Sequence, residues 1–425
     1  MLTMAAMVGM LVVAGAPADR PWTTWQPLPV VMPAPNAWDL YLQAFGRMHE
    51  IDVARGLASD QPPDFSQLKP PAKPPPQPLP DKWEIGPFGL PLPQRVALYA
   101  DVLAVVRQAL GEECLIPPYQ SLEDTGQMVP EFARFRDFAR LFAMEAEVRR
   151  SEGHFAEAAD SALDCMQMAQ QVATQRTIIA CLVGDACESM GAKALDEAVP
   201  RLSPAQLRHV ISRLATIEDR RVRLADILDG EERFALITLK DLGDDPRGLL
   251  TDERPGSEAS GKTYIEARDA ARVFAQVAGA WREVLGYFDQ VRATERLPYR
   301  LRRPVPPATN DLARMETDFY PPFLFRFADA RTTASLRQAR LAARCYLLER
   351  GELPASLHDL VPTYLRPVPV DAFSGGPLRS KLSAGVFVIY SVGPDGIDDD
   401  GRPIQGRVGI KSRGDMVVTV QAAAR

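Results

Sequence analysis

Cysteine and histidine are both scarce in this chain of 425 residues, which has five cysteines and four histidines. The cysteines show neither CxxC spacing nor histidines placed to share a metal ion with them, which excludes the common structural zinc sites. No HExxH pair occurs, and no GxSxG sequence is present to hold a nucleophilic serine at a strand-to-helix turn. We therefore predict buried free thiols, no catalytic residue and a non-enzymatic protein.

Long runs of one charge are also absent. The formal net charge is -6, and the basic residues are dispersed along the chain. A nucleic-acid interface or a polybasic membrane surface needs a concentrated positive patch. The sequence therefore predicts no nucleic-acid partner, and contact with a membrane only through the N-terminal segment.

That N-terminal segment is apolar but short. Residues 1–18 are too few to span a bilayer comfortably as a helix. Ala14 and Ala16 have the small-x-small spacing of a cleavage site, although no basic residue precedes the run and Pro17 would follow the cut. We predict a signal peptide or a truncated membrane anchor, and hence an extracytoplasmic protein, secreted or anchored. A buried N-terminal helix is the alternative.

Proline dominates the next part of the chain. Residues 19–93 are proline-rich, with one helical stretch at 36–57. A proline-rich sequence favours extended backbone, and we interpret residues 19–93 as a stiff spacer. Residues 94–325 then have apolar side chains at helical spacing, which predicts a helical domain. Ser203 followed by a proline predicts a helix start.

One helix pair in this domain, at 141–169, has a glycine at its turn and small residues on the return helix, as in a tetratricopeptide unit. No second clean copy follows at a fixed period, so an irregular helical bundle remains equally possible. Short apolar runs at 385–392 and 416–421, bounded by glycine, proline and aspartate, predict strands of a small α+β domain over 326–425. The predicted fold class is mainly α with this small domain at the end.

The string GSEASGKT matches the phosphate-loop pattern G-x-x-x-x-G-K-[ST] at Gly256, Gly261, Lys262 and Thr263. A phosphate cradle requires a buried strand leading into the loop, and the preceding text is polar and broken by proline. The most that this motif supports is an alternative function as a nucleotide-binding protein. A loop before a helix is the simpler interpretation.

The sequence YSVGPDGIDDDGRP gathers four aspartates, at 395 and 398–400, directly after a predicted strand, and Asp415 follows further on. Carboxylates this close repel one another unless they are solvated or hold a cation, and oxygen ligands favour calcium. The EF-hand register fails, because Arg407 stands where the closing glutamate belongs. A solvated polar turn therefore remains open beside a calcium site.

The last quarter of the chain, from Tyr346 to Gly401 in particular, resembles the C-terminal headpiece of the major pseudopilin of type II secretion. Three motifs match: a G-x-x-P-x-S-L turn after a helix, a YLxxxPxDPF/W-G segment, and an S-x-G-x-D-G loop. The matching residues are Gly351, Pro354, Ser356, Leu357, Tyr364, Leu365, Pro369, Asp371, Phe373, Gly375, Ser391, Gly393, Asp395 and Gly396.

This resemblance implies a calcium ion held by Asp395, by the backbone carbonyl of Val392 and by Asp415. Asp398 and Asp400 replace a glycine-rich run of the family and are possible extra ligands. A pseudopilin begins with a membrane-spanning stretch continuous with its long helix, whereas here the corresponding helix is internal. We therefore expect a bacterial envelope scaffold or interaction protein with envelope partners, and keep membership of a type II secretion-like assembly as an alternative.

Overall fold

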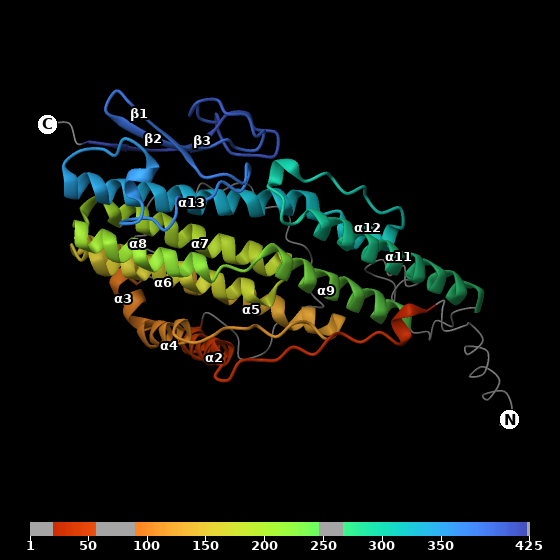
Figure 1. Ribbon diagram of the computed structural model, residues 1–425. Helices are drawn as coiled ribbons and strands as arrows, with labels where there is room; N and C mark the ends of the chain where they lie inside the picture. The colour runs from red at the N-terminus through yellow and green to blue at the C-terminus, as the bar shows by residue number, and fades with distance from the viewer. Residues whose placement is uncertain (1–19, 57–89, 246–266, 423–425) are drawn as a thin grey trace, which may run out of the picture.

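The computed structural model describes residues 20–56, 90–245 and 267–422. Helices dominate, and one three-stranded antiparallel sheet lies near the C-terminus (Figure 1), so the mainly α fold with a small α+β part is confirmed at this level. The α-helices are α2 (Ala37–Ala54), α3 (Leu92–Leu98), α4 (Ala100–Leu110), α5 (Leu122–Ser151), α6 (Phe155–Val172), α7 (Ile178–Ala198), α8 (Pro204–Asp219), α9 (Leu224–Asp244), α11 (Ala267–Thr294), α12 (Asp311–Thr317) and α13 (Tyr320–Arg350). Short 3-10 helices are η2 (Pro21–Thr23), η4 (Ala173–Gln175), η5 (Val199–Arg201), η6 (Tyr299–Leu301) and η7 (Leu357–Leu360). The strands are β1 (Arg379–Ser383), β2 (Val386–Ser391) and β3 (Met416–Gln421).

Local sequence signals fix several helix ends. The predicted start at Ser203 is confirmed, because its hydroxyl accepts the N–H of Gln206 at 3.4 Å while the Gln206 side chain accepts the N–H of Ser203 at 2.8 Å. The predicted helix–turn–helix at 141–169 is also present as α5 and α6. Gly153 lies in the turn between them at φ +86°, a conformation that favours glycine.

The helices α6 and α7 approach so closely that only glycine fits at two positions of α7. A Cβ atom added at Gly184 would lie 2.7 Å from the carbonyl oxygen of Ala169, and one at Gly191 would lie 2.7 Å from that of Ala162. Gly184 thus faces Ala169 and Gly191 faces Ala162, and the two contacts are seven residues apart on each helix. Backbone-to-backbone contact of this kind brings the most atoms of both helices within van der Waals range.

Aromatic side chains fill the space between α2 and α5. Phe45 stacks on Phe138 with ring centroids 5.2 Å apart, and Tyr41 meets Phe135 edge-on at 4.9 Å. All four side chains are buried. The helix predicted inside the proline-rich segment is therefore present and belongs to the core of the bundle.

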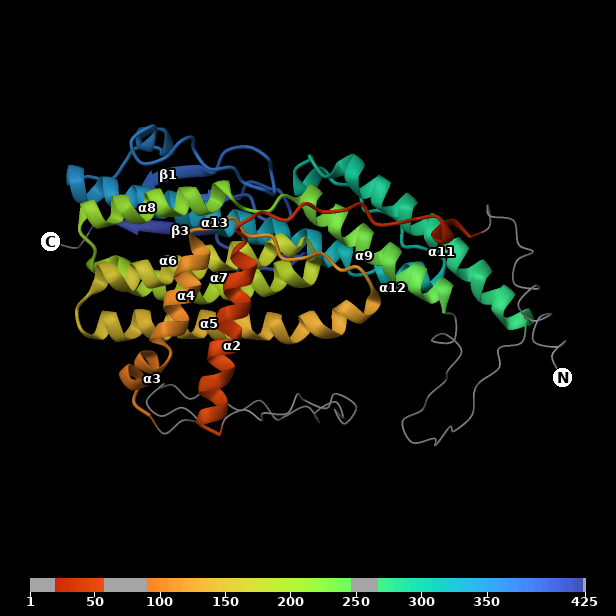
Figure 2. The same cartoon turned by 90° about the horizontal axis from the view of Figure 1, so that it is seen from below.

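The extended chain before α2 also lies on the bundle, as the long red segment in Figure 2 shows. Trp22 is 1% exposed, and a Cβ atom added at Gly243 of α9 would lie 2.5 Å from its indole ring. Trp25 packs edge-on against Trp281 of α11 at 5.4 Å, and Arg233 donates to the carbonyl of Leu28. Residues 20–36 are thus docked along the helices, although their composition alone predicts a spacer.

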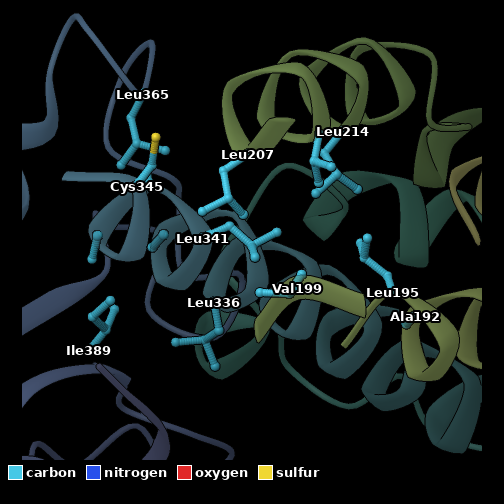
Figure 3. Close-up of a cluster of buried hydrophobic side chains, with 14 of the residues drawn as sticks. Ala192, Leu195, Val199, Leu207, Leu214, Leu336, Leu341, Cys345, Leu365 and Ile389 are labelled. Atoms are coloured by element: carbon cyan, nitrogen blue, oxygen red, sulfur yellow. The ribbon is translucent and has the colours of Figure 1, made fainter. Parts of the chain in front are cut away.

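The small sheet packs on α13, and one continuous core joins it to the bundle. Figure 3 shows Leu207 of α8, Leu336 and Leu341 of α13, and Ile389 of β2 in this core. The strands have the order β1-β2-β3, and both neighbouring pairs are antiparallel. The two predicted strands correspond to β2 and β3. The sequence analysis missed β1, because its sequence RSKLS is polar and its side chains lie mostly at the surface.

All five cysteines are free and buried, as predicted for small core residues. Among the described residues, no helix is long and apolar enough to cross a membrane.

The α6–α7 contact predicts a large difference between two glycine substitutions. Gly191→Ala places a methyl group against the Ala162 carbonyl and should lower the free energy of unfolding by about 1–3 kcal/mol. Gly286→Ala, in the interior of α11, meets no described atom within 4 Å and should raise it by up to about 1 kcal/mol through helix propensity. Urea unfolding followed by circular dichroism measures both, and equal effects would contradict the close contact.

Candidate functional site

The loop between β2 and β3, residues 392–415, contacts the outer face of the sheet at residues 398–401 and the edge of β3 at residues 402–404. Its two ends meet tightly, because a Cβ atom at Gly393 would lie 2.5 Å from the carbonyl oxygen of Gly414, and Gly393 has φ +67°. In the middle of the loop, Gly401 rests on Val388 and Tyr390 of β2. The backbone of the acidic stretch is thus held against the sheet at Gly401.

Two of its aspartates pair with basic side chains of β1. Arg379 donates to the Asp398 carboxylate, and the Lys381 ammonium lies 2.8 Å from the Asp400 carboxylate. Arg379 and Lys381 are two residues apart, so both point from the same face of the strand. The structure therefore accounts for two of the acidic charges by ion pairs across the loop. All four side chains lie at the surface, where such pairs contribute little to stability.

Asp415 differs from these residues because it is fully buried. Its carboxylate accepts the N–H of Gly401 at 2.6 Å and the N–H of Asp399 at 3.4 Å. Burial raises the pKa of Asp415, and the two accepted hydrogen bonds oppose that shift. In the described parts of the chain, no lysine, arginine or histidine forms an ion pair with this buried carboxyl group.

Asp395 lies at the other end of the loop and contacts the same region. Its carboxylate accepts the N–H of Ile397 at 3.1 Å and that of Gly414 at 3.4 Å, which ties the start of the loop to its end. The charges of Asp399 and Asp395 also raise the pKa of Asp415, so the three carboxylates are electrostatic neighbours. Val392, which begins the loop, is buried.

The arrangement of side chains limits the number of side-chain ligands that a metal ion could have in this loop. Among the described residues, no group of three or more histidine, cysteine, aspartate or glutamate side chains is arranged to hold a metal ion. The loop brings Asp395 and Asp415 together and directs Asp398 and Asp400 toward β1. Any calcium site would thus consist of two carboxylates completed by backbone carbonyls and water, all of them hard oxygen ligands that suit calcium.

Asp371 organises the start of the loop. The sequence analysis matched this residue to a motif but did not place it at the site. Asp371 is 1% exposed, and its carboxylate accepts four hydrogen bonds. The donors are the Phe373 N–H at 3.0 Å, the Ser374 hydroxyl at 2.8 Å, the Ser391 hydroxyl at 2.8 Å and the Val392 N–H at 3.3 Å. Asp371 therefore joins its own turn to the end of β2. The sequence signal was an aspartate three residues before Ser374 and the glycines Gly375 and Gly376, residue types that favour turns.

The sequence analysis gave no sign of a second acidic centre, which lies where α7, α9, α12 and α13 meet. Glu231 is 5% exposed and accepts from the N–H of Ile178 and from the Tyr320 hydroxyl at 3.3 Å. Burial raises the pKa of Glu231 to about 7, although these hydrogen bonds oppose the shift. Burial and the charge of Glu231 raise the pKa of Glu316 to about 7. The pair holds protons near neutral pH.

The phosphate-loop motif, with Gly256, Gly261, Lys262 and Thr263, lies outside the described residues. The described chain before it is the helix α9, and the chain after it is the helix α11. Nucleotide-binding proteins with a phosphate loop also have an apolar strand that ends in an aspartate. The nearest apolar run of this kind, residues 234–241, lies within the helix α9.

No family model matches this chain, and neither a curated protein nor a solved structure is significantly similar to it.

The four hydrogen bonds of Asp371 predict a strong effect of its removal. Asp371→Ala leaves four donors without their acceptor and should lower the free energy of unfolding by about 2–4 kcal/mol. Asp398→Ala, in the loop between β2 and β3, removes an exposed ion pair and one hydrogen bond accepted from the Asp400 N–H, and should cost about 0–1 kcal/mol. Chemical unfolding of both variants provides the comparison. A loss for Asp371→Ala no larger than that for Asp398→Ala would contradict the organising role.

The acidic pair predicts a pH dependence of a stated sign. Between the ordinary glutamate pKa of 4.5 and about 7, the unfolded chain releases the protons that the folded chain retains. This contribution to stability is therefore complete below pH 4.5 and is lost as the pH rises to about 7. Glu316→Gln keeps the site neutral and should raise the free energy of unfolding at pH 8 by about 1–3 kcal/mol, with little effect at pH 4.5.

Urea unfolding of Glu316→Gln at pH 4.5 and pH 8 tests this pH dependence. Glu352→Gln, at an exposed position, is the matched control. A Glu316→Gln effect that is the same at both pH values would show that the pair does not retain its protons.

Proposed function

We propose that this chain is a non-enzymatic scaffold or interaction protein of a bacterial envelope, with one structural calcium ion in the loop between β2 and β3. The observation that carries the metal part is Asp415, a fully buried carboxylate without a basic partner in the described chain and with two further carboxylates close by. A buried charge without a counter-ion is costly. A bound divalent cation would offset this cost.

The ligands in this proposal are the carboxylates of Asp395 and Asp415 and the backbone carbonyl of Val392. They come from both ends of the loop, since Val392 directly follows β2 and Asp415 directly precedes β3. Asp398 and Asp400 have their charges balanced by Arg379 and Lys381, and we leave them outside the ligand set.

Bound calcium would supply positive charge among Asp395, Asp399 and Asp415 and would thereby favour their ionised forms. Other residues of the chain position the ligands. Hydrogen bonds from Gly401 and Gly414 orient the two ligating carboxylates, and Asp371 holds the backbone at Val392. The ion would stabilise the folded chain because it binds that state alone.

The scaffold part of the proposal rests on the resemblance of residues 326–425 to the pseudopilin headpiece and on the packing of α13. This helix precedes the sheet, and its apolar side chains are buried against α8 and the sheet. A helix covered in this way has little apolar surface left for packing into a helical polymer. The packing favours a scaffold over a polymerising subunit of a secretion-like assembly.

Thermal unfolding of the full chain tests the calcium site. Free calcium about 100-fold above its Kd should stabilise the fold by about 2.7 kcal/mol, and the melting temperature should rise accordingly. Asp395→Ala and Asp415→Asn should each abolish the rise, because each removes a charged ligand. Asp400→Ala serves as the matched control in the same loop and should leave the rise intact.

The wild-type chain in excess EGTA and in magnesium completes the comparison. Two outcomes would contradict the calcium site. One is a wild-type melting temperature that does not rise with calcium, and the other is a rise of the same size in Asp395→Ala and Asp415→Asn.

A further inference from the structure

A cleft with a volume of about 440 Å3 lies between the loop that follows α4, the helix α6 and the end of α8. The loop contributes residues 111–114, and Arg220 directly follows the last residue of α8. The volume falls in the range of small-molecule sites, about 300–1,000 Å3. None of the residues that line the cleft belongs to the loop between β2 and β3, so the cleft is separate from the candidate calcium site.

Buried hydrogen bonds join two sides of this cleft. Gln171 of α6 is 9% exposed, and its side-chain nitrogen donates to the carbonyls of Ala109 and Glu112 at 3.1 Å each. Its side-chain oxygen accepts the Tyr41 hydroxyl. These bonds tie the loop after α4 to α6, so the fold itself fixes the position of the loop.

The glutamine and threonine side chains that line the cleft already donate hydrogen bonds within the protein. The Gln167 amide donates to the carbonyl of Leu110 at 2.8 Å, and the Gln170 amide donates to the Glu188 carboxylate at 2.8 Å. The Thr216 hydroxyl donates to a carbonyl of its own helix at 3.2 Å. A ligand in the cleft therefore meets mainly hydrogen-bond acceptors.

One of these acceptors is buried and has no donor. Gln170 is 7% exposed, and among the described residues no group donates to its side-chain oxygen. Its nitrogen faces Glu188, so the planar amide group turns the oxygen away from that carboxylate. A buried polar atom without a partner costs free energy, and a ligand that donates to this oxygen would recover the cost.

The cleft also has separate charges of opposite sign. Glu112 and Glu113 lie in the loop after α4, whereas Arg220 lies at the end of α8. In the described parts of the chain, none of these three side chains forms an ion pair. The two carboxylates and the guanidinium group thus come from different elements, and their charges are available to a ligand.

Other charged groups that contact the lining glutamines are already neutralised. Arg213 donates to the Gln167 oxygen at 3.2 Å and pairs with Asp164 at 3.0 Å. Glu188 pairs with Arg221 at 2.9 Å. The charges that remain for a ligand are therefore the two carboxylates and the one guanidinium group.

We propose that this cleft binds a free amino acid or a short peptide, with its ammonium group at Glu112 and Glu113 and its carboxylate at Arg220. An ammonium group has three N–H donors and no acceptor, which suits two carboxylates and the oxygen of Gln170. A guanidinium group donates to both oxygens of a carboxylate at once.

The pattern of charges selects this class of ligand over two others. A phosphorylated ligand would be repelled by the two glutamates, and a neutral sugar would leave all three charges of the cleft without a complement. The inference adds a ligand site to the proposed scaffold role, and it does not depend on the calcium ion.

Isothermal titration calorimetry of the full chain tests the site with the dipeptide Leu-Ala, in which only the two ends are charged. N-acetyl-Leu-Ala lacks the ammonium group, and Leu-Ala amide lacks the carboxylate. We expect saturable binding of Leu-Ala, and binding of each blocked form that is weaker by about tenfold or more.

Two variants remove the two contacts separately. The double variant Glu112→Gln/Glu113→Gln should bind Leu-Ala and its N-acetyl form equally and still discriminate against the amide. Arg220→Gln should bind Leu-Ala and its amide equally and still discriminate against the N-acetyl form. Arg272→Gln, at an exposed position of α11 outside the cleft, is the matched control and should behave as the wild type.

A purely structural effect of these substitutions would weaken the binding of all three probes alike and would overturn the proposal. Failure of Leu-Ala to bind the wild type saturably would overturn it as well. All titrations are run in EGTA and in calcium, so that failure of the calcium site is distinguished from failure of the cleft.

Discussion

The arrangement of this protein depends on the contact between α6 and α7, where glycine and alanine let two helix backbones touch. Gly184 and Gly191 face Ala169 and Ala162, and no larger residue fits at either glycine. This helix pair is central in the bundle: α5 packs against both helices, α4 and α8 pack against α6, and the α7 side chains Ala192 and Leu195 belong to the core beneath the sheet. A change in the separation of α6 and α7 would therefore shift α4, α5 and α8, which pack against them.

The C-terminal sheet is part of this same packing. The core beneath it continues through α13 to α8 and α7, as Leu207, Leu341 and Ile389 illustrate in Figure 3. Burial of this shared apolar surface accounts for the fixed position of the sheet, because hydrophobic burial is the main favourable term in folding. The sheet and the bundle consequently share one core.

Negative charge in the loop after β2 serves different purposes at different positions. Asp398 and Asp400 are balanced by β1, whereas Asp415 is buried and orders the backbone of the loop. The same residue has a second role through its main chain, since its N–H and C=O pair with Arg402 and Ile404 and tie the loop to the start of β3. Under the proposed function, an ion at the Asp415 carboxylate would thus also stabilise the loop at residues 401–404.

Local sequence was enough to predict the elements whose signals lie within a few residues. Helical periodicity predicted the bundle, Ser203 and Pro204 predicted the start of α8, and short β-branched runs predicted β2 and β3. These signals act through the residue's own turn or strand, so they need no knowledge of the rest of the chain.

The tertiary structure decided the features that depend on residues far apart. The polar strand β1 exists because β2 lies beside it, and its arginine and lysine bind two aspartates that composition alone left unassigned. The proline-rich segment lies on the bundle because Trp22 finds a space opened by Gly243, more than 200 residues away. The high pKa of Glu231 and Glu316 likewise arises from burial at a junction of four helices. Burial and long-range pairing are properties of the folded chain, which no periodicity within a single segment contains.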